Sequence, residues 1–194
     1  MATKEEIKES AYYCFAHCGY EGTTMQDIAK AVGLKKQSLY SHFGSKEELY
    51  LTILHEEQKK IMAEISAAYH LLKDKPAEEM LHGLFESCVS IFSDKERLLL
   101  WKRTFIYFGS GQKIFDKEVP DWHFDSGLRD ALYEGLKRSF AELADMNVFK
   151  SFFISYMLML QSYLDWMLVM GYDQESLRKV WITFWDGAKS FFQV

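Results

Sequence analysis

Apolar residues recur three and four positions apart along almost the whole chain, which is the period of an amphipathic helix. No run of strand length alternates between apolar and polar residues. Helix-start signals and glycines divide this pattern into segments, and start signals with the spacing of a capping box lie at Thr3, Thr24 and Ser45. These features predict an all-α fold, since each helix has an apolar face to bury against its neighbours.

The same signals set the expected helix boundaries. We expect helices over about residues 4–19, 24–33, 35–42, 46–69, 76–92, 95–108, 127–143, 148–170 and 174–192. Gly19, Gly33 and Gly171 are the expected stops, because glycine readily adopts the left-handed conformation that often follows a helix. Asn147 and Asp173 are the expected amino-terminal caps of the last two helices.

The segment Val148–Met170 is apolar and long enough to cross a bilayer. It also contains Lys150 and Asp165, and charged side chains are costly at the centre of a membrane. The start of the chain, MATKEEIKES, has no apolar stretch of the kind found in signal peptides. We therefore expect a buried helix and no membrane partner.

The three cysteines are an odd number without the spacing of a disulfide framework, which indicates a reduced, cytoplasmic protein. Cys14, His17 and Cys18 lie close together on one predicted helix. They offer too few ligands for a metal site, and packing is the better account of them. We expect no metal and no cofactor.

The stretch GLKKQSLYSHFGSKEEL, from Gly33 to Leu49, has few apolar residues for a folded helix. It follows another predicted helix after a tight glycine-containing turn, which is the layout of a helix-turn-helix. In that unit the second helix enters the major groove of DNA, so its outer side chains are polar. The expected anchors are Leu34, Leu39 and Phe43, and the expected groove-facing residues are Lys36, Gln37, Ser38, Tyr40 and Ser41.

A solvated surface helix is the alternative interpretation, in which the two adjacent lysines have no function. An outward tyrosine between Ser38 and His42 is less common on such a surface. The net charge of −5 argues against indiscriminate binding of nucleic acid, so a DNA contact must depend on local placement of the lysines.

The run GYEGTTMQDIAKAVGLKKQSLYSHFGSKEEL, from Gly19 to Leu49, resembles the DNA-binding segment of TetR/AcrR-family transcriptional regulators. The matching elements are GY, TT, IA-x-x-x-G, LY-x-HF and GSKEEL. The resemblance is close over about the first 50 residues, and beyond them it rests on length and helical layout alone. It implies an N-terminal three-helix helix-turn-helix DNA-binding domain (1–48) and a C-terminal helical ligand-binding and dimerisation domain (49–194). A long linking helix of about 46–69 would join them.

The resemblance also implies a function: a ligand-responsive regulator, usually a repressor, that binds a palindromic double-stranded operator as a homodimer. A small hydrophobic or amphipathic effector would release it. Whether this chain represses or activates stays open.

The resemblance implies specific DNA contacts. Lys36 and Gln37 would read bases, because lysine suits guanine and glutamine suits adenine. Gln26 would reach either a base edge or a phosphate, and Ser41 would touch a base. The implied phosphate contacts are Thr24, Ser38, Tyr40, His42 and Lys46.

Lys35 departs from the family pattern, which often has Ser or Thr at the start of the reading helix. Lysine cannot accept the capping hydrogen bond, and its charge is unfavourable near the positive helix end. Lys35 is therefore either an additional phosphate contact or a replacement that tertiary packing tolerates.

Most of the phenylalanines and all five tryptophans lie beyond residue 50. Aromatic residues at helical spacing are usually core, but the family pattern adds an effector cavity. The candidates are Trp101, Phe105, Phe108, Trp122, Tyr133, Tyr163 and Trp166. Asp165 would be a pocket acid that favours a cationic lipophilic ligand, or it pairs at an interface or reaches solvent. The family pattern also places the dimer contact on about 148–170 and 174–192.

An enzyme is the main alternative class. The sequence has no GxSxG, P-loop, HExxH or dinucleotide-binding motif, and the six histidines show no catalytic pairing. We expect that the protein is not an enzyme. A helix-turn-helix protein that acts only through protein partners is the third possibility.

Overall fold

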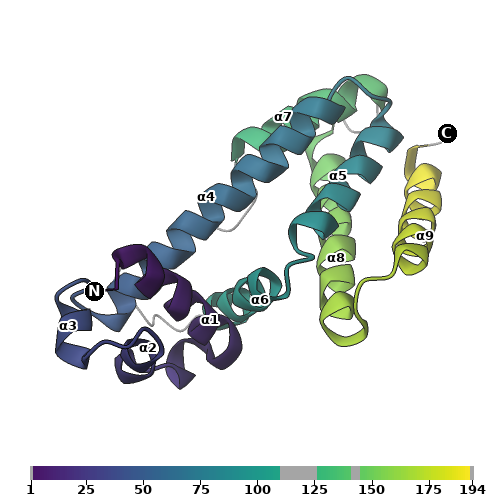
Figure 1. The fold of residues 1–194 in the computed structure, drawn as a ribbon. Coiled ribbons are helices and arrows are strands. Elements are labelled where there is room, and N and C mark those ends of the chain that lie inside the picture. Colours follow the sequence, from purple (N-terminus) through teal and green to yellow (C-terminus); the bar gives the residue numbers. More distant parts are fainter. Residues whose placement is uncertain (1, 110–125, 141–144, 193–194) are drawn as a thin grey trace. The chain divides into compact units, whose positions relative to one another are not determined.

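The computed structural model describes residues 2–109, 126–140 and 145–192 (Figure 1). At 105–109, 126–127 and 190–192 it describes the helix but not the side chains. The prediction of an all-α fold is confirmed, since the described regular elements are all helices. They are α1 (Lys4–Gly22), α2 (Met25–Ala31), α3 (Lys36–Tyr40), α4 (Lys46–Leu72), α5 (Ala77–Ile91), α6 (Lys95–Gly109), α7 (Ser126–Ser139), α8 (Met146–Met170) and α9 (Gln174–Phe192).

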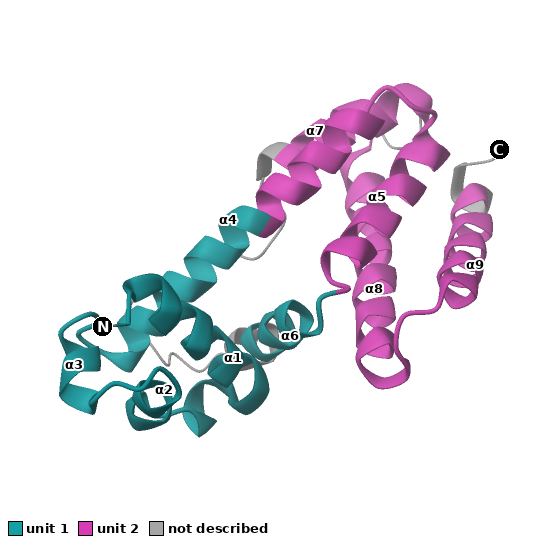
Figure 2. Ribbon diagram, viewed as in Figure 1, with its two compact units in different colours: residues 1–60, 94–122 teal, residues 61–93, 123–194 magenta. Residues whose placement is uncertain are grey.

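The chain forms two compact units, which are coloured separately in Figure 2. Unit 1 comprises residues 1–60 and 94–122, and unit 2 comprises residues 61–93 and 123–194. The first part of α4 and the whole of α6 therefore pack with the three amino-terminal helices. The predicted domain boundary at residue 48 follows the sequence motif rather than packing, and it stays a prediction.

The core of unit 1 draws one apolar face from each helix. Ile7 and Phe15 of α1 pack in one cluster with Ile28 of α2, Leu39 of α3 and Leu100 of α6. All five side chains are almost completely buried. Each contributes about 1.5–3 kcal/mol through burial of its apolar surface, so this core fixes the short α3 although α3 itself is too short to be stable alone.

Unit 2 is formed by α5, α7, α8 and α9 together with the end of α4. Tyr156 of α8 is buried and donates a hydrogen bond to the Leu81 carbonyl of α5 at 2.9 Å. The Tyr69 hydroxyl of α4 donates to the Ala131 carbonyl of α7 at 3.1 Å. Buried phenols thus keep a partner while their rings fill the core, which avoids the cost of an unpaired polar group.

The helix α8 is only partly buried, which corrects the expectation of a buried helix. By length and composition α8 could cross a bilayer, but only 33% of its most apolar 18-residue stretch is buried. Phe149, Tyr156 and Leu164 face the core of unit 2, whereas Ile154 and Leu158 are exposed. The sequence is apolar around the whole helix, so periodicity could not tell the inner face from the outer one.

Most predicted helix ends are confirmed, and the Thr3, Thr24 and Asp173 caps are present. The predicted Asn147 cap of α8 is wrong: Asp145 is the cap, and its carboxylate accepts from the Asn147 amide at 2.7 Å. Aspartate caps a helix as well as asparagine does, and Asp145 starts the helix two residues before the predicted cap. The helical path of α1 breaks at Gly19 as predicted, but one further turn continues to Gly22.

Candidate nucleic-acid interface

The helices α2 and α3 form the predicted helix-turn-helix within unit 1. Thr24 caps α2 by accepting from the Asp27 amide at 3.2 Å, and the Asp27 carboxylate accepts from the Thr24 amide at 3.1 Å. Gly33 has φ 66°, a left-handed conformation that costs glycine little. The Leu34 amide then donates to the Ala29 carbonyl at 2.8 Å, which closes the turn before α3.

The outer face of α3 is polar and accessible. Leu39 and Phe43 are buried and Leu34 is half-buried, so the three predicted anchors hold the helix to the core. The exposed residues are Lys35, Lys36, Gln37, Ser38, Tyr40 and Ser41, and His42 is half-buried. Every predicted groove-facing side chain is therefore free of the core.

Two contacts organise this face. The ammonium of Lys36 lies 5.9 Å from the centre of the Tyr40 ring, so these two side chains share one side of the helix. The Ser41 hydroxyl donates to the Ser38 carbonyl at 2.7 Å. Its proton is thus used within the helix, and a contact from Ser41 to DNA would have to accept a hydrogen bond. Lys35 precedes α3 without a side-chain capping bond, as its chemistry predicts.

The amino-terminal end of α2 carries a fixed negative charge. The Thr24 hydroxyl donates to the Asp27 carboxylate at 2.6 Å, and this bond lowers the pKa of Asp27. The capping box thereby occupies the Thr24 and Asp27 amides. A phosphate at this helix end would meet the amides of Met25 and Gln26, whose N–H groups have no partner within a helix. The Asp27 charge is unfavourable for a phosphate at this helix end, which the sequence pattern at Thr24 does not reveal by itself.

Lys46, at the first position of α4, is bonded to the protein itself. Its ammonium donates to the Tyr20 carbonyl at 2.8 Å and to the Thr23 carbonyl at 3.0 Å. It also lies 4.0 Å from the centre of the Tyr20 ring. An ammonium has three N–H donors, so one is left for a phosphate. The predicted phosphate contact stays a prediction, and the internal bonds were missed because the carbonyls lie more than twenty residues away in sequence.

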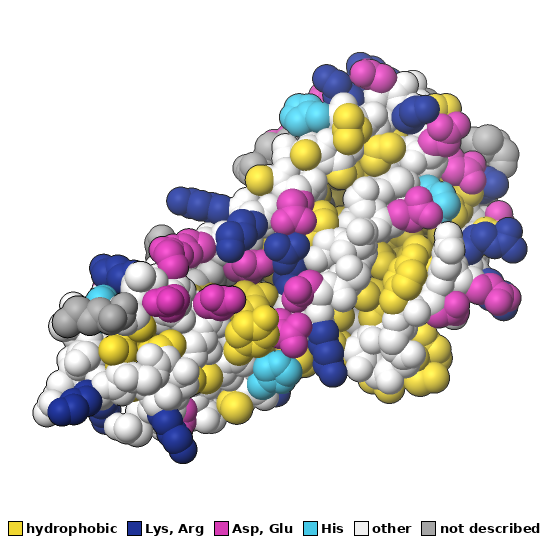
Figure 3. All heavy atoms as spheres, viewed as in Figure 1, with side chains coloured by type: hydrophobic (Ala, Val, Ile, Leu, Met, Phe, Trp, Pro, Cys, Tyr) yellow, Lys and Arg dark blue, Asp and Glu magenta, His cyan; other side chains and the backbone are white. Residues whose placement is uncertain are grey.

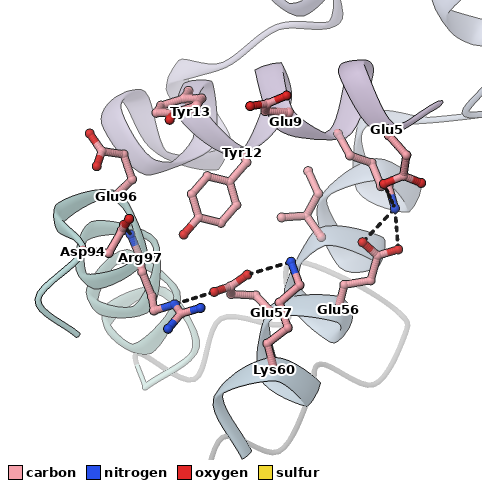
Figure 4. Close-up of a pocket in the computed structure, with 12 residues that line it drawn as sticks. Glu5, Glu9, Tyr12, Tyr13, Glu56, Glu57, Lys60, Asp94, Glu96 and Arg97 are labelled. Carbon is pink, nitrogen blue, oxygen red and sulfur yellow. Dashed lines mark hydrogen bonds and ion pairs between the residues drawn. The ribbon is translucent and has the colours of Figure 1, made fainter. Parts of the chain in front are cut away.

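A polar cleft of about 370 Å³ lies between α1, α4 and α6 of unit 1 (Figure 4). Figure 3 shows acidic and basic side chains side by side over this part of unit 1. Lys8 of α1 donates to both carboxylate oxygens of Glu56 at 2.7 and 2.8 Å. Arg97 of α6 donates to Glu57 at 2.7 Å, and Lys60 lies 3.5 Å from the same carboxylate. The residues that line the cleft therefore form ion pairs that connect α4 to α1 and to α6.

Replacing Arg97 by methionine is expected to lower the free energy of unfolding by about 1.5–3 kcal/mol, because a hydrogen bond to a buried carboxylate is lost. The Glu57 side chain is only 8% exposed, so water replaces the guanidinium poorly. Lys60→Met is the matched control, since Lys60 is the exposed partner of the same carboxylate and exposed pairs contribute about 1 kcal/mol or less. Urea unfolding of both variants measures the difference, and equal losses would contradict it.

The predicted effector residues are divided between the two units. Trp101 is buried in α6 of unit 1, whereas Tyr133 and Tyr163 lie in unit 2. The Tyr133 and Phe149 rings pack edge to face with their centres 4.9 Å apart. The Tyr163 hydroxyl donates a hydrogen bond to the Asp173 carbonyl at 2.9 Å.

The remaining effector candidates lie either at the surface or outside the described side chains. Asp165 and Trp166 are exposed on α8, and Trp166 is 48% exposed. Phe105 and Phe108 lie in α6, but their side chains are outside the described residues, as is Trp122 altogether. Of the effector candidates whose side chains are described, none lines the cleft of Figure 4. Their role in binding an effector stays a prediction.

These observations define a helix-turn-helix protein with an exposed, polar second helix. Residues 7–53 match the family of bacterial regulatory proteins called the tetR family. The chain is similar to the HTH-type transcriptional repressor AcnR of Corynebacterium glutamicum, with 34% identity over 84 residues (43% of this chain and 41% of AcnR). It is also similar to the biofilm operon icaADBC negative transcriptional regulator IcaR of Staphylococcus aureus, with 51% identity over 47 residues (24% of this chain and 25% of IcaR). The chain thus matches less than half the length of either relative.

The fold agrees over a longer stretch. A TetR-like transcriptional regulator from Rhodococcus sp. RHA1 has a TM-score of 0.68 and 18% identity, covering 97% of both chains. At that identity the likeness shows the fold alone. The amino-terminal helices therefore match the tetR family in sequence, and nearly the whole chain has the helical fold of a TetR-like regulator.

Proposed function

We propose that this protein is a transcriptional repressor that binds a palindromic operator as a homodimer and is released by a small, largely apolar effector. The observation that carries the proposal is the outer face of α3. Leu39 and Phe43 hold α3 in the core while its polar residues remain exposed. A surface with that composition fits the major groove, where hydrogen-bond donors and acceptors distinguish the bases. The names of AcnR and IcaR support repression over activation.

Within this proposal, Lys36 and Gln37 read bases. Both are exposed at the start of α3, the part of a recognition helix that contacts base edges. Ser41 adds a base contact, Gln26 reaches a base edge or a phosphate, and Ser38, Tyr40 and His42 hold phosphates together with Thr24 and Lys46. Because the chain has a net charge of −5, these few contacts rather than overall charge must supply the affinity.

Exposed apolar residues on α8 support the proposed homodimer. They are Ile154, Leu158, Trp166, Val169 and Met170, and they share the exposed side of the helix with Ser151, Ser155, Ser162 and Asp165. A two-fold contact would bury this face against its own copy. On α9 the support is weaker, because Ile182 is exposed among the charged residues Glu175, Arg178 and Lys179. A two-fold dimer also suits a palindromic operator.

The effector is the least constrained element of the proposal. The aromatic residues of the later helices favour an apolar or amphipathic ligand, and a solid aromatic core is the alternative. A coupling of about 1–3 kcal/mol between effector and operator would change operator affinity 5- to 150-fold. The helix α4 contributes to both units, so it is the covalent route by which an effector could act on the DNA-binding helices. We expect a cytoplasmic regulator without enzymatic activity.

Replacing Gln37 by alanine is expected to weaken binding to the selected operator by about 1–3 kcal/mol and to relax the base preference at one position per half-site. Lys36→Ala should act similarly at a neighbouring position, since both residues project from α3. The matched control is Lys59→Ala, which removes an exposed lysine of α4 in the same unit. Titration of operator variants with each protein tests the assignment. It fails if both α3 variants bind the operator like the parent.

A further inference from the structure

The end of α1 is held by a side chain from a distant part of the sequence. Because the helical path breaks at Gly19 (φ 73°, ψ 175°), the carbonyls of the preceding turn lose their partners within the helix. Arg103 of α6 supplies replacements. Its Nε donates to the Ala16 carbonyl at 2.8 Å, and its Nη2 donates to the His17 carbonyl at 2.8 Å. A guanidinium at this position also complements the negative end of the α1 dipole.

Residues 19–23, which we call the α1–α2 corner, are held from a second direction. Lys46 of α4 bonds the Tyr20 and Thr23 carbonyls, as described above. Thr23 is buried, and its hydroxyl contacts the Gly19 carbonyl at 2.8 Å and the Cys14 carbonyl at 3.0 Å. The next residue, Thr24, is the cap of α2. The path of the corner therefore sets where α2 begins.

We propose that Arg103 is a positioning residue for DNA binding: by capping the end of α1 from α6, it fixes the α1–α2 corner and thereby α2 and α3. The proposal rests on the proposed function, because it concerns the same DNA-binding helices. Arg103 itself touches no DNA. The planar guanidinium of arginine can donate to two carbonyls at once. The ammonium of a lysine, on a flexible side chain, is less suited to that geometry.

The attachment of α1 to α6 gives the proposal a structural basis. Both helices belong to unit 1 and pack against each other, with Leu100 of α6 in the same core cluster as Phe15 of α1. His17 of α1 also lies 3.4 Å from Glu96 of α6. A small displacement of α6 would therefore move the end of α1 that Arg103 caps. Only residues 19–23 separate that end from the start of α2.

Two other roles of Arg103 make different predictions. As a phosphate contact, Arg103 would contribute about one unit to the slope of log affinity against log salt concentration. As a general stabiliser, it would change the free energy of unfolding without changing the affinity of the folded molecules. A positioning residue changes the affinity of the folded protein and leaves the salt slope intact.

The test compares Arg103→Ala, Arg103→Met and Arg103→Lys with Lys95→Ala, which removes an exposed charge from the same helix. Arg103→Met keeps the aliphatic stem and serves if the alanine variant fails to fold. Operator titrations at several salt concentrations are corrected for the active fraction. Loss of the two hydrogen bonds to the Ala16 and His17 carbonyls should lower operator affinity about tenfold in the alanine and methionine variants. The slope of log affinity against log salt concentration should stay unchanged. Arg103→Lys should recover part of the loss, and Lys95→Ala should bind like the parent.

Amide hydrogen exchange of the free proteins tests the proposal without DNA. In Arg103→Met, exchange should accelerate at residues 16–29, while the helices of unit 2 keep the parent's protection. Unchanged protection at residues 16–29 would overturn the proposal, as would unchanged operator affinity or a salt slope lower by one unit. If the parent selects no operator, the proposed function fails, and the exchange result still decides whether Arg103 holds the corner.

Discussion

Replacing Leu158 by glutamate is expected to convert the proposed dimer to monomers and to abolish tight operator binding. Leu158 is 62% exposed, near the middle of the exposed side of α8 on which Ile154, Trp166 and Val169 also lie. At a two-fold contact the new carboxylate would be buried close to its own copy, which costs several kcal/mol. The two half-sites would then bind separately, and the loss of linked binding weakens operator affinity by about 10²- to 10⁴-fold.

Light scattering at micromolar concentration and operator titration measure the two effects. Leu71→Glu is the matched control, because Leu71 is 82% exposed but lies in α4, outside the proposed contact. The control should remain dimeric and bind like the parent. A parent protein that runs as a monomer, or a Leu158→Glu variant that remains a dimer, would contradict the proposed contact.

Replacing Phe15 by alanine is expected to lower the free energy of unfolding by about 3–5 kcal/mol, since it opens a cavity in a fully enclosed site. Phe15 has no exposed surface, and its ring meets the Tyr50 ring at 4.7 Å. A loss of that size is a large part of the roughly 5–15 kcal/mol that is typical of a folded domain. DNA binding should fail with the fold, because α2 and α3 share this core.

Tyr13→Ala is the control for Phe15→Ala, because Tyr13 lies on the same helix with an exposed side chain. Exposed substitutions of this kind change stability by about 0.5 kcal/mol. Denaturant unfolding compares the two variants. Similar losses from Phe15→Ala and Tyr13→Ala would show that the core of unit 1 is not organised around Phe15.

Local chemistry made much of the fold predictable from the sequence. The Thr3, Thr24 and Asp173 caps and the stops at Gly33 and Gly171 depend on residues a few positions apart, and all are present. At Gly19 the helical path breaks as predicted, although α1 continues to Gly22. The anchors Leu39 and Phe43 followed from helical periodicity around α3. The Asn147 prediction was wrong because Asp145, two residues earlier, has a side chain that accepts the same capping bond.

Long-range placement was not predictable. Arg103 reaches the end of α1 from more than eighty positions away, and Lys46 reaches the Tyr20 carbonyl across the fold. Periodicity and charge say nothing about such pairs. The aromatic residues illustrate the same limit: Trp101 and Tyr163 both have the spacing of core residues, yet they lie in different units. Spacing alone cannot distinguish a core from a cavity.

Selection of DNA from a pool of random duplexes by the purified protein tests the central claim most directly. The account predicts enrichment of a palindromic sequence, with half-site centres separated by about 10–10.5 base pairs or a multiple of that distance. Selection with Gln37→Ala should change the preferred base at one position in each half-site. Retention of DNA without any enriched sequence, or enrichment unaffected by substitutions on the outer face of α3, would contradict the account.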